Sequence, residues 1–258
     1  MVELKHKKTG TVFGAPKNKV FLADYNKDTQ SDWCPGCGNF SILSAVKKSL
    51  IELNIAPKQA VLVSGVGCYA KLPYWTKVNS FVGLHGRELA VAQGVKLANQ
   101  ELKIICFSGD GAGYGEGGNH FIHACRRDID LTYVVHNNNV FGLTTGQYSP
   151  TSKQGMVSKS SPQGSTEQPL NPLALAIVSG AKFVARAYSG DIKQLTEILK
   201  EAISYPGFSF VDIIQECITF NKFDTSQFSE LNHNIANKID ALNTTMDNKI
   251  KIGIYYKE

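Results

Sequence analysis

The chain has 258 residues, of which 43% are hydrophobic and 19% charged, so it has enough apolar material for one sizeable core. Its formal net charge of +5 is modest and its lysines and arginines are scattered, which excludes the basic stripe of a nucleic-acid-binding face. No apolar run approaches the length of a membrane span, and none follows the charged residues in 1–10. We therefore expect a cytoplasmic protein without membrane or nucleic-acid partners.

From residue 40 onward, helical spacing of apolar residues alternates with short β-rich runs. The first predicted helix has an apolar face within residues 42–51, and the first strand covers 60–64. The remaining predicted helices cover 86–99, 117–126 and 192–204, the remaining strands 103–108, 131–136, 183–186 and 208–214, and one further βα segment covers 173–179. This order predicts an α/β fold in which a mostly parallel sheet is flanked by helices.

The composition also divides the chain into three parts. We interpret residues 1–30 as an N-terminal extension and residues 31–220 as the main domain. Beyond Asn221 the chain is rich in Asn and Lys, so residues 221–258 are predicted to be an appendage outside the sheet. Residues 147–172 are polar and lack periodicity, which indicates a long ordered loop or lid.

Two neighbouring strand ends carry oxygen ligands that suit a hard cation. Asp110 stands in a Gly-Asp-Gly sequence after one predicted strand, and Asn138 follows the next. Ligands in parallel sheets bind at such carboxyl ends. With the backbone carbonyl of Val140, these side chains would supply three ligands for Mg²⁺, while Gly109 and Gly111 let the backbone approach a diphosphate. A common Asp-Gly turn is the alternative interpretation of the motif alone.

Six cysteines in a chain without a secretory signal argue against a disulfide framework and for metal or redox use. Cys34 and Cys37 form a C-x-x-C pair, which is two ligands short of a four-coordinate site. Cys68 and Cys217 follow predicted strands and could complete it. Structural zinc would satisfy the same four thiolates. The other two cysteines, Cys106 and Cys125, lie within an apolar strand and a helix, so we expect them in the core.

Five motifs together resemble the β subunit of 2-oxoacid:ferredoxin oxidoreductases, over about residues 30–222. These motifs are WCPGCG at 33–38, GVGC at 65–68, GLHGR at 83–87, GDG at 109–111 and the segment 137–147. The resemblance implies a thiamine-diphosphate-binding fold, with magnesium held by Asp110, Asn138 and Val140. It implies one [4Fe–4S] cluster on Cys34, Cys37, Cys68 and Cys217. The residues implied to contact the cofactor are Val66, Gly67, Cys68, Tyr69, His85, Gly109, Asp110, Gly111, Ala112, Asn138, Gly142 and Leu143.

The resemblance also implies the reaction. Family members oxidatively decarboxylate 2-oxoacids with coenzyme A, giving acyl-CoA and carbon dioxide, and pass electrons through the cluster to ferredoxin. An α subunit, with a fused or separate γ part, is implied in an αβ or (αβ)₂ assembly and would supply the glutamate that activates the cofactor. His85 is a candidate polar or proton-transfer group, Lys71 a candidate for the substrate carboxylate, and Leu143 a candidate for shaping the pocket. Structural roles for His85 and a solvated surface position for Lys71 are the alternatives.

Two other functions remain open at this stage. One is a cluster-free thiamine-diphosphate decarboxylase or synthase subunit, and the other is a non-enzymatic, zinc-stabilised binding module. Within the family pattern, Glu116 replaces an expected aliphatic residue and Thr145 stands where lysine or glycine occurs. Pyruvate, 2-oxobutyrate, 2-oxoglutarate and branched 2-oxoacids are all possible substrates, and the GLTTGQ string at 142–147 favours a broad-specificity or 2-oxoglutarate enzyme.

Overall fold

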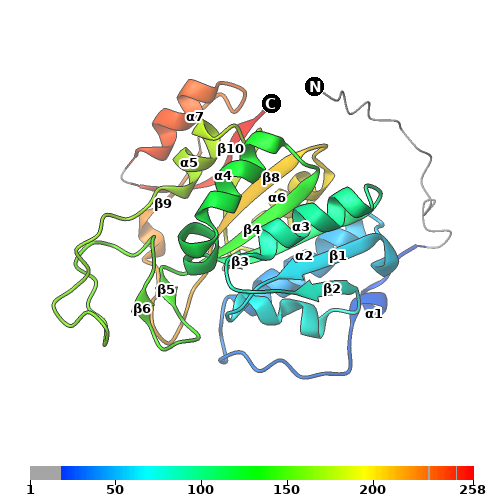
Figure 1. The fold of residues 1–258 in the computed structure, drawn as a ribbon, viewed down its shortest axis with the longest axis horizontal. Helices are drawn as coiled ribbons and strands as arrows, with labels where there is room; N and C mark the ends of the chain where they lie inside the picture. Colours follow the sequence, from blue (N-terminus) through cyan, green and yellow to red (C-terminus); the bar gives the residue numbers. More distant parts are fainter. Residues whose placement is uncertain (1–18, 232, 248) are drawn as a thin grey trace.

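The computed structural model describes residues 19–231, 233–247 and 249–258. Its main feature is an eight-stranded sheet in the order β2-β1-β3-β4-β8-β7-β10-β9 (Figure 1). The strands are β1 (Ala60–Ser64), β2 (Asn79–Val82), β3 (Lys103–Gly109), β4 (Leu131–Asn137), β7 (Phe183–Tyr188), β8 (Phe208–Ile214), β9 (Phe228–Glu230) and β10 (Ile250–Lys257). Neighbours from β2 to β7 are all parallel, whereas β10 runs antiparallel to β7. A separate two-stranded hairpin consists of β5 (Val140–Phe141) and β6 (Gln147–Tyr148).

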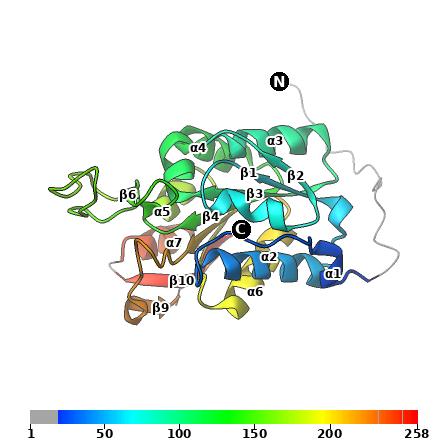
Figure 2. The same cartoon turned by 90° about the horizontal axis from the view of Figure 1, so that it is seen from below.

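Helices cover both faces of the sheet. They are α1 (Leu22–Tyr25), α2 (Asn39–Glu52), α3 (Glu88–Ala98), α4 (Gly118–Arg127), α5 (Pro172–Val178), α6 (Ile192–Ser204) and α7 (Lys238–Thr245). Short 3-10 segments cover Pro57–Gln59, Tyr69–Trp75 and Thr225–Gln227, and a π-helical turn covers Gly111–Glu116. Figure 2 shows α3 and α4 on one side of the sheet and α2 and α6 on the other. No described helix is long and apolar enough to span a membrane.

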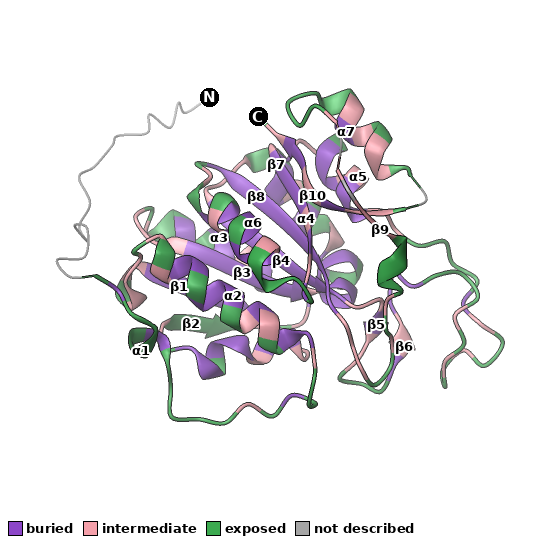
Figure 3. Ribbon diagram, turned by 180° about the vertical axis from the view of Figure 1, so that it is seen from behind, coloured by how far each residue is buried: buried purple, intermediate pink, exposed green. Residues whose placement is uncertain are grey.

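The two cores follow from the alternation of side chains along each strand. In β3, Ile105 and Phe107 pack into the core under α2 and α6, whereas Ile104 and Cys106 pack into the core under α3 and α4. A parallel sheet covered on both faces has apolar residues at consecutive positions, and β4 and β8 are buried along their whole length (Figure 3). The predicted mostly parallel α/β architecture is confirmed.

Several predicted elements agree with the structure in both type and extent. The strands 60–64 and 208–214 and the helix 192–204 have the predicted bounds. The edge strand β2 was not predicted, and all four of its residues are exposed. An exposed strand has no buried face, so its sequence carries no alternating apolar signal.

The expectation that residues 221–258 lie outside the sheet is wrong for β9, which pairs with β10, and for β10 itself. This strand pairs with β7, and Tyr255, which is 1% exposed, packs into the core together with Ala241 of α7. Lysines interleaved with the apolar residues of β10 concealed the strand, because lysine is rare in strand interiors. The three-part division itself stays a prediction. Residues 1–18 of the expected N-terminal extension lie outside the described residues, while Val20 and Tyr25 pack into the core.

Candidate active site

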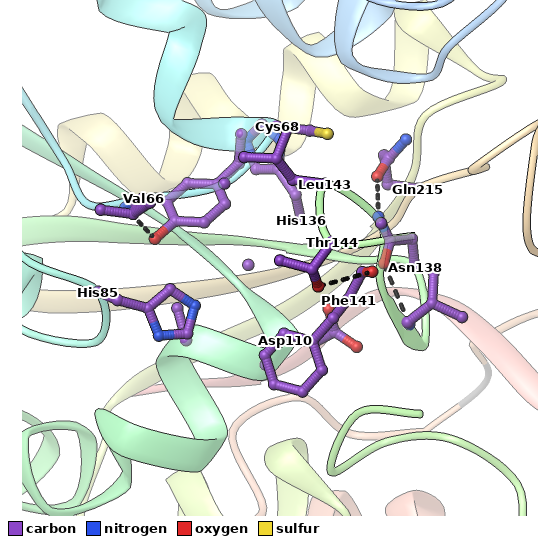
Figure 4. A pocket seen from close by; sticks show the side chains of 17 residues that line it. Val66, Cys68, His85, Asp110, His136, Asn138, Phe141, Leu143, Thr144 and Gln215 are labelled. Carbon is purple, nitrogen blue, oxygen red and sulfur yellow. Dashed lines mark hydrogen bonds between the residues drawn. The ribbon is translucent and has the colours of Figure 1, made fainter. Parts of the chain in front are cut away.

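One cavity lies at the carboxyl ends of β1, β3 and β4 (Figure 4). All twelve residues that the family resemblance assigns to the cofactor line it, and so does Val140. The lining also contains four residues that were not predicted: His136, Phe141, Thr144 and Gln215. Residues from five separate chain segments therefore surround one space, and their binding of a cofactor stays a prediction.

Asp110 is the acidic group of this cavity. It follows β3, is 2% exposed, and accepts hydrogen bonds from the Ser149 hydroxyl at 2.6 Å and the Thr151 hydroxyl at 2.7 Å. Burial is the main cause that raises the pKa of Asp110 to about 6, against the lowering effect of these hydrogen bonds. A bound cation would favour the ionised carboxylate and offset the cost of burying it. The environment of Asp110 thus fits a magnesium ligand.

Asn138 approaches the same cavity from β4, which pairs with β3 in parallel. Its amide nitrogen donates to Gln215 Oε1 at 2.8 Å, and its carbonyl oxygen accepts from the Val140 backbone nitrogen at 3.2 Å. An amide oxygen has a second lone pair, which remains available to a cation. Ligation of magnesium by Asp110, Asn138 and Val140 stays a prediction that these positions fit.

The glycines of the Gly-Asp-Gly motif lie against two aromatic rings of the cavity wall, where a larger residue would collide. A Cβ atom on Gly109 would lie 3.0 Å from the Tyr69 ring, and one on Gly111 would overlap the Phe141 ring. The Tyr69 and Phe141 rings therefore pack directly against this turn at the cavity wall, and glycine is the residue that admits them.

Hydrogen bonds and close packing bring together the segments that carry the four predicted cluster cysteines. The indole nitrogen of Trp33, next to Cys34, donates to the backbone oxygen of Cys68 at 2.7 Å. The backbone nitrogen of Gly38, next to Cys37, donates to the Glu216 oxygen at 3.2 Å. A Cβ atom on Gly142 would lie 3.6 Å from Cys217 Sγ, which places that sulfur beside the cavity loop.

The electrostatics of the thiols reflect this grouping. Burial raises the pKa of Cys37 to about 11, and charge on the other three predicted cluster cysteines contributes to that rise. Burial also raises the pKa of Cys68, with Cys217 as the next cause. In the described part of the chain, no three His, Cys or carboxylate side chains already stand in an arrangement that could hold a metal ion. Thiolates are the ligands of iron–sulfur clusters, so the donor set fits, but cluster binding stays a prediction.

Cys106 and Cys125 are both fully buried in the core, as predicted.

The three predicted catalytic residues have different surroundings. His85 lines the cavity, and its Nδ1 lies 3.2 Å from Oε2 of Glu116, one of the two residues noted above as unexpected in the family pattern. Leu143 also lines the cavity and is 49% exposed. Lys71 is not among the lining residues, and its Nζ pairs with Asp32 at 2.8 Å. Their catalytic roles stay predictions.

His136 was not among the predicted site residues, but it lines the cavity while being 1% exposed. Burial lowers the pKa of His136 to about 3, so the ring is neutral, and its Nδ1 lies 2.7 Å from Asn39 Oδ1. Gln215 was also missed. Its position directly after the buried strand β8 was the available signal, since polar residues at strand ends face ligand sites in parallel sheets.

A buried acid supports Tyr69 from behind the cavity. The Tyr69 hydroxyl donates to Glu88 Oε1 at 3.2 Å, and Ser108 donates to the same oxygen. Glu88 is 1% exposed, and burial raises its pKa. No sequence pattern identifies Glu88 as a buried acid, because the first turn of a helix is an ordinary exposed position for glutamate.

Comparisons with known proteins agree with this geometry. Residues 65–213 match the family described as thiamine pyrophosphate enzyme, C-terminal TPP binding domain. Subunit beta of 2-oxoacid:ferredoxin oxidoreductase 1 from Aeropyrum pernix is 48% identical over 207 residues, covering 80% of this chain and 65% of that subunit. This chain therefore matches less than two thirds of that subunit's length. Subunit beta of a 2-oxoacid:ferredoxin oxidoreductase from a Sulfolobus species is 40% identical over 250 residues, covering 88% of this chain and 82% of that subunit.

A solved structure gives the same result at the level of the fold. It is a 2-oxoglutarate:ferredoxin oxidoreductase from Magnetococcus marinus with 2-oxoglutarate, coenzyme A and succinyl-CoA bound. Its chain superposes with a TM-score of 0.90 at 35% identity, covering 93% of this chain and 85% of that one. The predicted thiamine-diphosphate-binding fold is confirmed. The chain thus belongs to the thiamine pyrophosphate enzymes and, within them, to the family of 2-oxoacid:ferredoxin oxidoreductase β subunits.

Proposed function

We propose that this chain is the cofactor-binding β subunit of an enzyme that converts a 2-oxoacid and coenzyme A to acyl-CoA and carbon dioxide, with ferredoxin as electron acceptor. The observation that carries the proposal is the position of Cys68, which lines the same cavity as Asp110 and Asn138. One residue thus belongs both to the predicted cofactor contacts and to the predicted cluster ligands. Electron transfer between the two sites would be short-range.

In this proposal, Asp110, Asn138 and the Val140 carbonyl hold Mg²⁺ and, through it, the diphosphate of the cofactor. Thiamine diphosphate, when bound, supplies the carbon nucleophile and electron sink for decarboxylation. The chain's own residues orient the cofactor and hold its charge. Ser149 and Thr151 fix the Asp110 carboxylate, and Glu88 fixes the Tyr69 ring against the cavity wall.

A [4Fe–4S] cluster on Cys34, Cys37, Cys68 and Cys217 would supply one-electron transfer. The hydrogen bonds of Trp33 to Cys68 and of Gly38 to Glu216 support this assignment, since they hold together the three segments that carry the four cysteines. Gly142 lines the cavity and also approaches Cys217, since a Cβ atom on it would lie 3.6 Å from the Cys217 sulfur. The path from cofactor to cluster would therefore stay within this chain.

An α subunit would complete the site. Among the described lining residues Asp110 is the only acid, so a glutamate that activates the cofactor has to come from elsewhere. Val66 and Leu143 at the cavity are about half exposed, Leu84 is 75% exposed, and the edge strand β2 is exposed throughout. Exposed apolar groups beside a free strand edge are typical of a protein interface. We propose that the α subunit covers this face.

For the substrate we propose 2-oxoglutarate before pyruvate, within a broad 2-oxoacid range. The solved relative contains 2-oxoglutarate, and Leu143 and Thr144 of the GLTTGQ string both line the cavity. We propose that Lys71 leaves its ion pair with Asp32 and binds a substrate carboxylate. This is either the distal carboxylate of 2-oxoglutarate or the carboxylate next to the 2-oxo group.

The test is anaerobic reconstitution of the chain with its α subunit, iron, sulfide, Mg²⁺ and thiamine diphosphate, followed by turnover with a panel of 2-oxoacids. We expect a brown protein, coenzyme-A-dependent release of carbon dioxide, and reduction of ferredoxin. A colourless protein that retains stoichiometric zinc after anaerobic purification would contradict the cluster and support the zinc-stabilised module. Turnover without bound iron would support the cluster-free decarboxylase.

A further inference from the structure

The side chain of Gln215 connects the two predicted cofactor sites. It is 1% exposed and directly follows β8. Its Oε1 accepts a hydrogen bond from Asn138 Nδ2 at 2.8 Å, and its Nε2 lies 3.6 Å from Cys37 Sγ, within donor distance for sulfur. Figure 4 shows the Gln215 and Asn138 side chains bonded at the cavity. One buried amide thus contacts a predicted magnesium ligand at one end and a predicted cluster ligand at the other.

We propose that Gln215 is a positioning residue that sets the orientation of Asn138 and tunes the cluster through Cys37. This inference rests on the proposed function and deepens it. By accepting the Asn138 amide hydrogen, Gln215 leaves the Asn138 oxygen as the atom that can bind a cation. Residues that orient ligands in this way commonly control metal affinity as strongly as some ligands do.

The second half of the proposal concerns the sulfur. An N–H group that donates to a ligand thiolate stabilises its negative charge, and the reduced cluster carries more negative charge than the oxidised one. Hydrogen bonds to sulfur therefore raise the reduction potential of an iron–sulfur cluster. The backbone N–H of Asn39 also donates a hydrogen bond to Cys37, which stabilises the thiolate form of that residue. Gln215 adds a side-chain donor, whose Nε2 also donates to the Glu216 backbone oxygen, and substitution can remove it.

The backbone around Gln215 keeps this bridge in place. The Gln215 nitrogen donates to the Asn137 oxygen at 2.9 Å, which extends the pairing of β8 with β4 beyond the strand end. A Cβ atom on Gly38 would lie 3.1 Å from Gln215 Cγ. The C-x-x-C loop therefore packs directly on this side chain, and the bridge is built from three chain segments that meet here.

The test compares Gln215→Leu with the unchanged chain, both full length and reconstituted anaerobically with iron and sulfide. An EPR-monitored redox titration gives the midpoint potential, and isothermal titration with Mg²⁺ and thiamine diphosphate gives the cofactor affinity. We expect a more negative potential and an affinity about 10- to 100-fold weaker, the usual effect of losing a group that orients a ligand. Gln93→Leu is the matched control, because Gln93 is a buried glutamine on α3 that does not line the cavity.

Gln215→Glu separates the two halves of the proposal. It keeps an acceptor for Asn138 but removes the donor to Cys37, so the potential should fall while the cofactor affinity stays unchanged. It also provides a second variant if Gln215→Leu does not fold. A lower melting temperature with both potential and affinity unchanged would overturn the inference, leaving a structural role. If the unchanged chain assembles no cluster, the proposed function fails before any variant is compared.

Discussion

Asp110 and Asn138 line one cavity although they are 28 positions apart in the sequence. They line the same cavity because β3 and β4 are adjacent and parallel, with Gly109 paired to His136. Both strands therefore end at the same edge of the sheet. Asp110 is nevertheless buried with only hydroxyl and N–H partners in the described structure. A buried carboxylate without a cation costs free energy, and the first prediction follows from this cost.

Asp110→Asn is expected to stabilise the cofactor-free chain at pH 7 while abolishing magnesium-dependent cofactor binding. The folded pKa of Asp110 is about 6, above its unfolded value, so the ionised group destabilises the fold above pH 6. The shift corresponds to about 3 kcal/mol. We expect the substitution to increase the unfolding free energy by roughly 1–2 kcal/mol. The gain is smaller than the full cost of the charge because an amide accepts fewer hydrogen bonds from Ser149 and Thr151 than a carboxylate. Urea unfolding and isothermal titration measure the two effects.

The pH dependence of that difference provides its control. Below pH 4 Asp110 is protonated in both folded and unfolded states, so the advantage of the asparagine should disappear there. A constant difference from pH 7 to pH 4 would show that the gain comes from packing. Retained magnesium-dependent cofactor binding by Asp110→Asn would contradict the assignment of Asp110 as a ligand.

The second prediction concerns the six cysteines. Replacing any one of the four predicted cluster ligands by alanine should lower bound iron and acid-labile sulfide and remove the brown colour, because a cluster needs all of its ligands. Cys106→Ala and Cys125→Ala are the matched controls, since both residues lie in the core away from the cavity. They should lose about 1 kcal/mol of stability but keep full iron content. Iron loss in a control, or iron retention in all four ligand variants, would refute the assignment.

The sequence predicts most of the fold because the buried elements have strong patterns. Helix α6 has a clear apolar face, and β8 is an unbroken apolar run, so both could be located to the residue. The cavity could be predicted because its ligands follow such strands directly, where parallel sheets bind ligands. The motif resemblance added the cofactor, which the residues alone left open.

Long-range polar contacts could not be predicted in this way. Gln215 contacts Asn138 across 77 positions and Cys37 across 178, and no local pattern reports such pairs. Strand β10 was missed for a related reason, since its pairing with β7 is decided by tertiary packing against the adjacent sheet edge. Glu88 became a buried partner of Tyr69 only because α3 begins beside the cavity.

The third prediction tests Lys71 as the residue that meets a substrate carboxylate. In the described structure Lys71 pairs with Asp32 at 2.8 Å, so it must exchange partners to serve this role. Lys71→Met should raise KM for the 2-oxoacid about tenfold with little change in kcat, the loss of one charged hydrogen bond. Asp32→Asn should lower KM by freeing the lysine. Steady-state kinetics of the assembled enzyme measure both KM values. An unchanged KM in both variants would show that the Lys71–Asp32 ion pair has only a structural role at the surface.

The last prediction concerns acid stability and His136. Burial holds the pKa of His136 at about 3 in the folded chain, well below its value near 6.5 in an unfolded one. Above pH 6.5 the ring is neutral in both states and has no effect on the pH dependence. As the pH falls from 6.5 toward 3, the unfolded chain gains a proton that the folded chain rejects, so stability is lost by about 1.4 kcal/mol per pH unit. Asp110 acts in the opposite direction between pH 6 and pH 4, because its folded pKa is raised and its protonation favours the fold.

In the unchanged chain, the opposite effects of His136 and Asp110 on stability therefore nearly cancel between pH 6 and pH 4. The substitution His136→Gln should remove the histidine effect and leave that of Asp110. A glutamine does not titrate, so the variant should gain stability relative to the unchanged chain as the pH falls from 6 to 4, by about 1.4 kcal/mol per unit. Urea unfolding at four pH values in this range measures the slope, with His123→Gln, which changes a histidine outside the cavity, as control. Parallel curves for His136→Gln and the unchanged chain would mean that the ring is protonated in the fold. A charged imidazolium would then lie beside the cavity, where Asp110, the only carboxylate among the described lining residues, already accepts hydrogen bonds from two hydroxyls.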